Sequence, residues 1–297
     1  EKKKQKETLQ KRFLSEMQKV RTEYGQSNFN FDKVLSNELS SNLKETLLKR
    51  HKMTSHLRTK MVDWMFEVIR FFKCSTQSYF LAVNLMDLYI AKTKEILQNE
   101  DTLLLGSTCV FIATKFEEVV PVFLENLVNE AAHGDFEPND IKKMERKVLN
   151  TIGIESLVYT STYEIISKLF NDFLFENEAL LKKTKTASFF DYLQEASFFI
   201  SKILLHFETT YQKDFVFTSV ACIMAAFCVL EEKKKDSITE NATTVFHSWI
   251  KNMANINNLK FKELEEYRNK IFKTYNDYFH TKGICYNLRK YSPLSFI

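Results

Sequence analysis

The chain has 297 residues, of which 44% are hydrophobic and 27% are charged, so it can bury a substantial core. It contains only 5 glycines and 3 prolines, whereas soluble proteins average about 7% and 5% of these residues. The glycines are too widely spaced to build a phosphate-binding loop or a G-x-S-x-G elbow. A hairpin-rich β protein would also need more turn residues. The composition therefore favours an all-α protein that is not an enzyme.

The net charge of +4 is mild, and the basic residues are interleaved with 38 acids. A nucleic-acid interface needs a clustered basic stripe, so we expect no nucleic-acid partner. No stretch reaches 18 uninterrupted apolar residues, so we expect no membrane span. The chain starts at Glu1 without a signal peptide, and we expect an upstream part and a location in the nucleus, the cytoplasm or both. Five scattered cysteines predict buried, reduced thiols.

Two amphipathic segments open the chain. Residues 1–24 place five apolar side chains on one helix face: Leu9, Phe13, Met17, Val20 and Tyr24. This stripe is either a surface helix packed on its own domain or a docking or coiled-coil segment. A second segment, about 32–50, aligns leucines on one face.

Two series of five helical patterns follow. The first is expected near 56–72, 78–92, 101–118, 122–130 and 138–152, and the second near 160–175, 187–208, 215–231, 240–254 and 261–279. The third helix of each series is apolar or small nearly all round, which is typical of the central helix of a bundle.

The two series are internally similar. Residues 106–115 align with 218–227, and Lys115 in the first copy corresponds to Phe227 in the second. This period predicts two tandem five-helix bundles. We therefore expect an N-terminal helical extension (1–55), a first bundle (56–158), a second bundle (159–280) and a tail (281–297).

Catalytic and metal-binding patterns are weak in this sequence. The six histidines are isolated, and His51 and His56 do not have the i, i+4 spacing of a helical metal pair. The acidic pairs Glu117–Glu118 and Glu231–Glu232 fall at helix ends, where such pairs are usually solvated. We predict no catalytic residues, no metal site and no cofactor.

Two charged pairs are more informative. Arg58 and Asp87 lie among apolar neighbours, where they either form a buried pair that fixes a helix crossing or extend outward to solvent. Lys115 and Glu145 would form an exposed pair rimmed by Ile112, Phe116 and Ile154. Such a pair indicates a partner-binding surface, and the alternative is an ordinary surface ion pair worth under about 1 kcal/mol.

Four motifs appear in order: Leu57-Arg-Thr-Lys-Met-Val-Asp-Trp-Met-Phe-Glu-Val, Leu81-Ala-Val-Asn-Leu-Met-Asp, Ala113-Thr-Lys-Phe-Glu-Glu and Met144-Glu-Arg-Lys-Val-Leu. Together they resemble a cyclin box, closest to those of A/B-type mitotic cyclins. The clear match covers about 56–158, and the second bundle is similar to the degenerate C-terminal cyclin fold.

The resemblance implies a regulatory subunit that binds and activates a cyclin-dependent protein kinase by packing on the kinase's C-helix. The family's five signature residues fall on Arg58, Asp87, Leu104, Lys115 and Glu145, and the first two would form the buried pair. The implied kinase-binding residues are Lys115, Glu145, Ile112, Phe116, Ile154, Glu117 and Glu118. The 32–50 helix would pack on the kinase from the side.

The resemblance also implies a groove for substrate or inhibitor peptides that carry Arg-x-Leu. It would use Leu57, Lys60, Met61, Trp64, Glu67 and Leu103, with Glu67 receiving the peptide arginine. Lys60 replaces an aliphatic residue and Leu103 a glutamine of the family. Because a cation repels an arginine-bearing peptide, we expect this docking to be weakened. Trp64 is also consistent with plain core packing.

Two other functions remain open at this stage. One is a cyclin-fold scaffold in a larger assembly, which Lys60, Leu103 and the 1–24 segment favour. The other is a DNA-binding relative of the fold, against which the mild, mixed charge argues.

Overall fold

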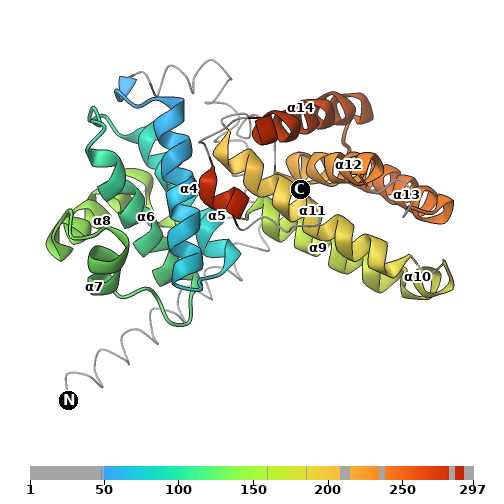
Figure 1. Cartoon of the computed structure of the whole chain (residues 1–297), viewed down its shortest axis with the longest axis horizontal. Coiled ribbons are helices and arrows are strands. Elements are labelled where there is room, and N and C mark those ends of the chain that lie inside the picture. Colours follow the sequence, from blue (N-terminus) through green and yellow to red (C-terminus); the bar gives the residue numbers. More distant parts are fainter. Residues whose placement is uncertain are drawn as a thin grey trace. The chain divides into compact units, whose positions relative to one another are not determined.

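The computed structural model describes residues 48, 50–158, 160–184, 186–207, 215–233, 238–280 and 285–290. These residues form helices joined by short connections and contain no strand (Figure 1). The all-α fold class is therefore confirmed. The apolar stripe of residues 1–24 and nearly all of the 32–50 segment lie outside the described residues.

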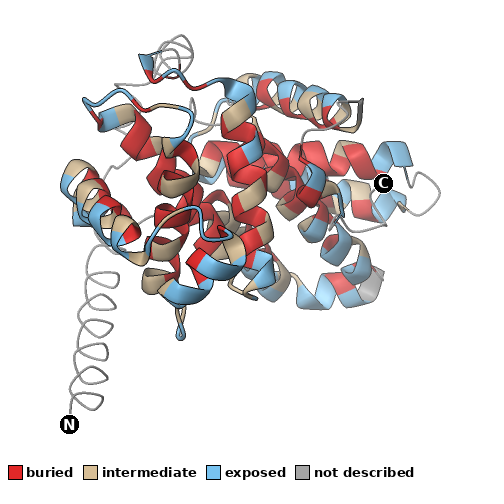
Figure 2. Cartoon of the chain, turned by 60° about the vertical axis from the view of Figure 1, so that its left-hand side comes forward, coloured by how far each residue is buried: buried red, intermediate tan, exposed pale blue. Residues whose placement is uncertain are grey.

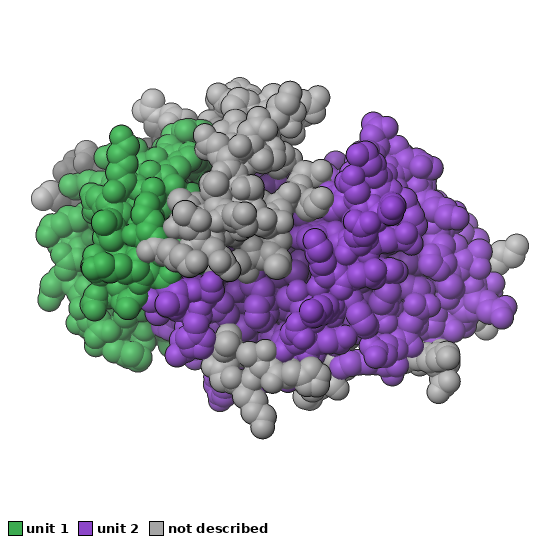
Figure 3. All heavy atoms as spheres, turned by 90° about the horizontal axis from the view of Figure 1, so that it is seen from above, with its two compact units in different colours: residues 1–38, 46–53, 68–159 green, residues 39–45, 54–67, 160–297 purple. Residues whose placement is uncertain are grey.

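The chain divides into two compact units, coloured separately in Figure 3. Among the described residues, the first unit comprises 48, 50–53 and 68–158, and the second comprises 54–67 and the residues from 160 onward. Helix α4 (Ser55–Phe71) thus gives residues 55–67 to the second unit and its last turn to the first. The domain bounds expected from the sequence, which place all of this helix in the first bundle, stay a prediction.

The first unit is built on three long helices: α5 (Thr76–Lys92), α6 (Asp101–Glu117) and α8 (Pro138–Ile152). Short elements connect and follow them: α7 (Leu124–Asn126), the π-helical turn η1 (Leu127–Ala131) and the 3₁₀ turn η2 (Ile154–Leu157). Helix α5 packs against α6 and α8, and α6 packs against α8. Pro138 occupies the first turn of α8, where its missing N–H leaves no helix bond unmade.

The second unit contains α9 (Thr162–Glu176), α10 (Glu178–Thr184), α11 (Ala187–His206), α12 (Phe215–Lys233), α13 (Glu240–Ile256), α14 (Phe261–His280) and α15 (Tyr286–Lys290). Helix α12 packs against α9, α11, α13 and α14. It is therefore the central helix of this unit, as its apolar composition predicts.

One helix among the described residues, α12, is by length and composition apolar enough to cross a membrane. In this structure, however, 72% of the apolar segment of α12 is buried inside the protein. Buried positions gather on the inner faces of the helices in Figure 2, and exposed positions lie on the outer faces. The apolar character of α12 therefore comes from core packing.

The structure explains why Phe227 occupies the position that corresponds to Lys115 in the internal repeat. Its ring stacks on that of Phe246 at a centroid separation of 3.9 Å, and the two planes differ by 3°. Phe227 is 2% exposed. In the second unit, the position equivalent to Lys115 thus belongs to the core and carries no charge.

Candidate partner-binding site

The candidate site of the first unit centres on Lys115, in the last turn of α6, and Glu145, on α8. The Lys115 Nζ donates a hydrogen bond to Glu145 Oε1 over 2.5 Å. The two side chains are 39% and 16% exposed, respectively. Because α6 and α8 pack against each other, the pair predicted from the sequence forms with both charges still reachable from solvent.

The apolar surroundings of this pair differ in part from those expected. Phe116 is half-buried and Ile154 is 56% exposed, so both offer surface to a partner. Ile112 is only 3% exposed, because it shares an inward face of α6 with Cys109. The expected contribution of Ile112 to the rim is therefore wrong for this structure. Phe111 lies beside the pair instead, with its ring centroid 4.8 Å from Lys115 Nζ.

Three apolar residues follow α6 directly and extend the exposed apolar surface. Val119 is 89% exposed, and Val120 and Phe123 are also largely exposed. These three residues were not predicted. The available signal was an apolar run around Pro121 without helical periodicity, in which only Val122 is buried.

Glu118, expected at the kinase interface, has a structural partner within the first unit. Its Oε1 accepts hydrogen bonds from the Ser75 backbone N–H over 2.6 Å and from the Ser78 hydroxyl over 2.5 Å. Ser75 is also the N-cap of α5, accepting from the Ser78 N–H. A carboxylate at a helix N-terminus interacts favourably with the helix dipole. Glu118 therefore anchors α5, while neighbouring Glu117 is half-buried.

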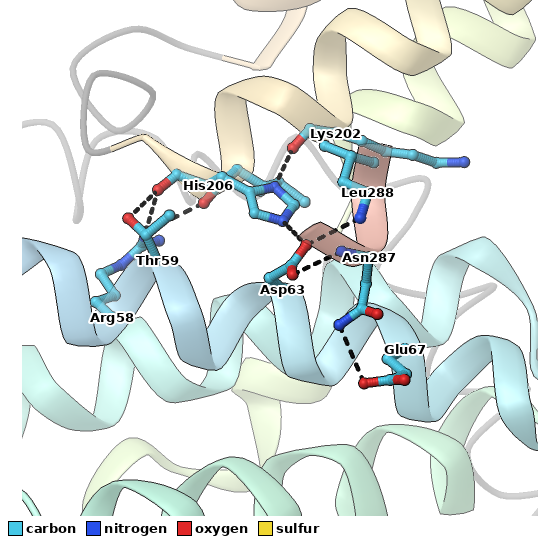
Figure 4. A network of polar contacts seen from close by, with 9 residues as sticks. Arg58, Thr59, Asp63, Glu67, Lys202, His206, Asn287 and Leu288 are labelled. Atoms are coloured by element: carbon cyan, nitrogen blue, oxygen red, sulfur yellow. Dashed lines mark hydrogen bonds and ion pairs between the residues drawn. The ribbon is translucent and has the colours of Figure 1, made fainter. Parts of the chain in front are cut away.

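A second polar cluster lies in the second unit, where α4 meets the C-terminal end of α11 (Figure 4). The Arg58 guanidinium donates to the carbonyls of Leu205 and His206 over 3.1 and 3.4 Å. The Thr59 hydroxyl donates to the same His206 carbonyl over 2.9 Å. The last carbonyls of a helix have no partner within it, and a cation there interacts favourably with the helix dipole.

Arg58 is 2% exposed, so it lies in the interior and does not extend outward to solvent. The contact of Arg58 with α11 could not be predicted, because its acceptors are backbone carbonyls, which every residue carries. Asp87 is half-buried. The pairing of Arg58 with Asp87 that the resemblance implies stays a prediction.

Asp63 is the centre of this second cluster. Its Oδ1 lies 3.4 Å from His206 Nε2, and its two oxygens accept the backbone N–H groups of Asn287 and Leu288 over 2.9 and 3.0 Å. Burial alone would raise the pKa of Asp63. The contact with His206 and the two N–H groups outweigh burial and hold the pKa of this carboxyl below its ordinary value.

The His206 ring is oriented by its other nitrogen. Nδ1 donates to the Lys202 carbonyl over 2.8 Å, so a neutral ring would turn the Nε2 lone pair toward the Asp63 carboxylate.

The residues expected to line the peptide groove differ in how far they are buried. Met61 is buried, Leu57, Trp64 and Leu103 are half-buried, and Lys60 is exposed. Glu67, the residue expected to receive a peptide arginine, accepts a hydrogen bond of 3.0 Å from the side-chain amide of Asn287. No pattern in the sequence indicates this contact, because Asn287 lies 220 residues away from Glu67.

All five cysteines are free thiols, and Cys109, Cys222 and Cys285 are buried. Burial raises the pKa of Cys74 to about 11 and that of Cys285 to about 12, with smaller contributions from nearby acids. Within the described ranges, no group of three or more His, Cys, Asp or Glu side chains could hold a metal ion.

Comparison with known proteins relates this chain to one family. Residues 30–155 match the family described as "Cyclin, N-terminal domain". The chain is 31% identical over 129 residues to the G2/mitotic-specific cyclin-B3 of Drosophila melanogaster, covering 43% of this chain and 22% of that protein. It is 36% identical over 104 residues to the S-phase entry cyclin-5 of Saccharomyces cerevisiae, covering 35% and 23%.

The fold is similar to that of a viral cyclin from herpesvirus saimiri, with a TM-score of 0.55 at 15% identity. That similarity covers 81% of this chain and 96% of the viral one. The resemblance to cyclins and the cyclin-type fold are thus confirmed. The matched region spans less than a quarter of the two cellular relatives.

Proposed function

We propose, from the premise that residues 30–155 are a cyclin N-terminal domain, that this chain is a regulatory subunit of a cyclin-dependent protein kinase. It binds the kinase through the surface around Lys115 and Glu145 and activates it by packing on the kinase's C-helix. Peptides of substrates or inhibitors then dock on α4. The chain performs no catalysis of its own and acts in the nucleus, the cytoplasm or both.

The observation that carries the proposal is the Lys115–Glu145 pair. Its 2.5 Å hydrogen bond holds an ammonium and a carboxylate side by side, which together can donate to and accept from a partner's main chain. Phe116, Ile154 and the run that starts at Val119 supply apolar surface in the same unit. Exposed apolar side chains beside a hydrogen-bonded charged pair fit a partner-binding surface with a polar rim.

Activation follows from differential affinity. A kinase exchanges between an inactive and an active position of its C-helix, and a partner that binds the active form more tightly raises its population. A shift from 1:99 to 99:1 needs about 5.5 kcal/mol of preference. An apolar surface of several side chains can supply that energy, whereas a single exposed ion pair cannot.

The binding step can be tested with purified proteins. The cyclin-dependent kinases encoded in the same genome are immobilised, and the affinity of the chain is measured for wild type and for Lys115→Ala/Glu145→Ala. Glu178→Ala/Lys182→Ala is the matched control, because it removes an exposed Lys–Glu pair from the second unit. We expect one kinase to bind wild type and control equally, and the site variant at least tenfold more weakly.

A cyclin-fold scaffold without kinase activation is the second candidate function. It is favoured by the exposed Lys60 and by the engaged Glu67, which together disfavour the expected docking of arginine-bearing substrates. The same experiment separates the two functions, because a scaffold would bind no kinase and its other interactions would be insensitive to the Lys115→Ala/Glu145→Ala change.

A further inference from the structure

The C-terminal segment Cys285–Lys290 lies against α4 as a ligand supplied by the chain itself (Figure 4). Three hydrogen bonds join it to α4. Asp63 accepts two of them from backbone N–H groups, and Glu67 accepts the third from the Asn287 side chain. Both α4 carboxylates drawn in this view therefore have partners within the chain.

The segment is held firmly at its inner side. Leu288 is 1% exposed, and its N–H bond to Asp63 is buried. Arg289 donates to the Tyr278 carbonyl, and its guanidinium carbon lies 4.9 Å from the centroid of the Tyr278 ring. These contacts fix the segment to α14 as well as to α4.

The bond between Asn287 and Glu67 is the outer and more replaceable contact. Glu67 is half-buried, whereas Asp63 is almost fully buried. A carboxamide donates a single hydrogen bond here, whereas a guanidinium can donate two charge-assisted bonds to one carboxylate. An arginine from outside would thus be the better partner for Glu67, but it must first displace Asn287.

We propose that residues 285–290 form an autoinhibitory strap, which lowers the affinity of the α4 face for arginine-bearing docking peptides by occupying Glu67. The proposal rests on the docking role of α4 in the proposed function and adds to it an intramolecular competitor. The exposed ammonium of Lys60 acts in the same direction, because it repels the same peptides.

The test uses a fluorescein-labelled peptide carrying Arg-x-Leu and measures its anisotropy with the full chain. Asn287→Ala removes the bond to Glu67 and leaves the backbone bonds to Asp63 in place. Asn252→Ala, at an exposed position of α13, is the matched control. Each variant is also made with Glu67→Gln, and thermal unfolding confirms that all are folded.

We expect Asn287→Ala to bind the peptide about three- to tenfold more tightly than wild type, the factor expected for one competing hydrogen bond. Asn252→Ala should match wild type. Glu67→Gln should abolish the gain in the Asn287→Ala background and change wild type much less. Equal affinity of wild type and Asn287→Ala, or no binding by either, overturns the proposal.

Kinase activation is measured with the same proteins. If the strap is wrong but the proposed function is right, all variants activate the kinase and Asn287→Ala gives no gain in peptide affinity. If the proposed function itself is wrong, no variant activates a kinase, whatever the peptide does.

Discussion

The carboxylate of Asp63 and the imidazole of His206 lie 3.4 Å apart, one on α4 and the other at the last residue of α11. Asp63 also accepts hydrogen bonds from the N–H groups of Asn287 and Leu288, in the first turn of α15. One buried side chain therefore joins three helices of the second unit (Figure 4). An unpaired buried charge is costly, so the removal of any one of these partners should destabilise the folded protein.

Replacement of Asp63 by Asn should destabilise the protein by about 2–4 kcal/mol, because in either orientation the new amide turns its NH2 donor toward one of the two N–H groups that Asp63 accepts. Urea unfolding measures the change. Asp191→Asn, an exposed position on α11, is the control and should stay within about 0.5 kcal/mol of wild type. Equal stability of the two variants would contradict the role given to Asp63.

The depressed pKa of Asp63 also predicts a pH dependence. The unfolded carboxyl, with a pKa near 3.9, takes up a proton at higher pH than the folded one. The stability that Asp63 contributes is therefore complete above that value and is lost as the pH falls through the folded pKa. The free energy of unfolding is measured from about pH 6 to about pH 3, the range in which carboxyl groups titrate. It should fall less steeply with decreasing pH for Asp63→Asn than for wild type. Parallel curves would exclude this linkage.

Glu118→Ala should lower stability by about 1–2 kcal/mol, because the variant leaves the Ser75 N–H and the Ser78 hydroxyl without their acceptor. The measurement is the thermal unfolding midpoint. Glu125→Ala, at an exposed position on α7, provides the comparison and should be nearly neutral. A neutral Glu118→Ala would show that this carboxylate does not anchor α5.

Phe227→Ala should lower the free energy of unfolding by about 3–5 kcal/mol, because it removes a buried ring and its stacking contact with Phe246. Phe175→Ala is a matched control, because that ring is 87% exposed on α9. Denaturant unfolding compares the two. A loss below about 1 kcal/mol for Phe227→Ala would argue against a packed core at this position.

The helices could be predicted largely from the sequence, because their faces repeat every three to four residues. The long helices begin and end within a few residues of the expected positions. The short helices α10 and α15 were not predicted. They have too few turns to show a period, and α15 depends on Asp63, a residue 224 positions away.

The candidate site could be predicted less completely. The Lys115–Glu145 pair follows from a lysine at the end of the apolar helix α6 and from the cyclin resemblance, which assigns Glu145 as its partner. The burial of Ile112 depends on which face of α6 turns inward, and an apolar helix gives no contrast by which to choose. The bonds of Glu118, Arg58 and Glu67 were missed because their partners are backbone groups or distant amides.

In the proposed function, the chain activates a kinase through Lys115 and Glu145. The most direct measurement is the rate of histone phosphorylation as the purified chain is titrated into the kinase it binds. We predict that wild type and the Glu178→Ala/Lys182→Ala control raise the rate about a hundredfold, the change expected when about 5.5 kcal/mol of binding preference shifts the kinase from 1:99 to 99:1 in favour of its active form. Lys115→Ala/Glu145→Ala should need at least ten times more protein for the same effect. A kinase that binds wild type but stays inactive, or equal activation by the site variant, would contradict the claim.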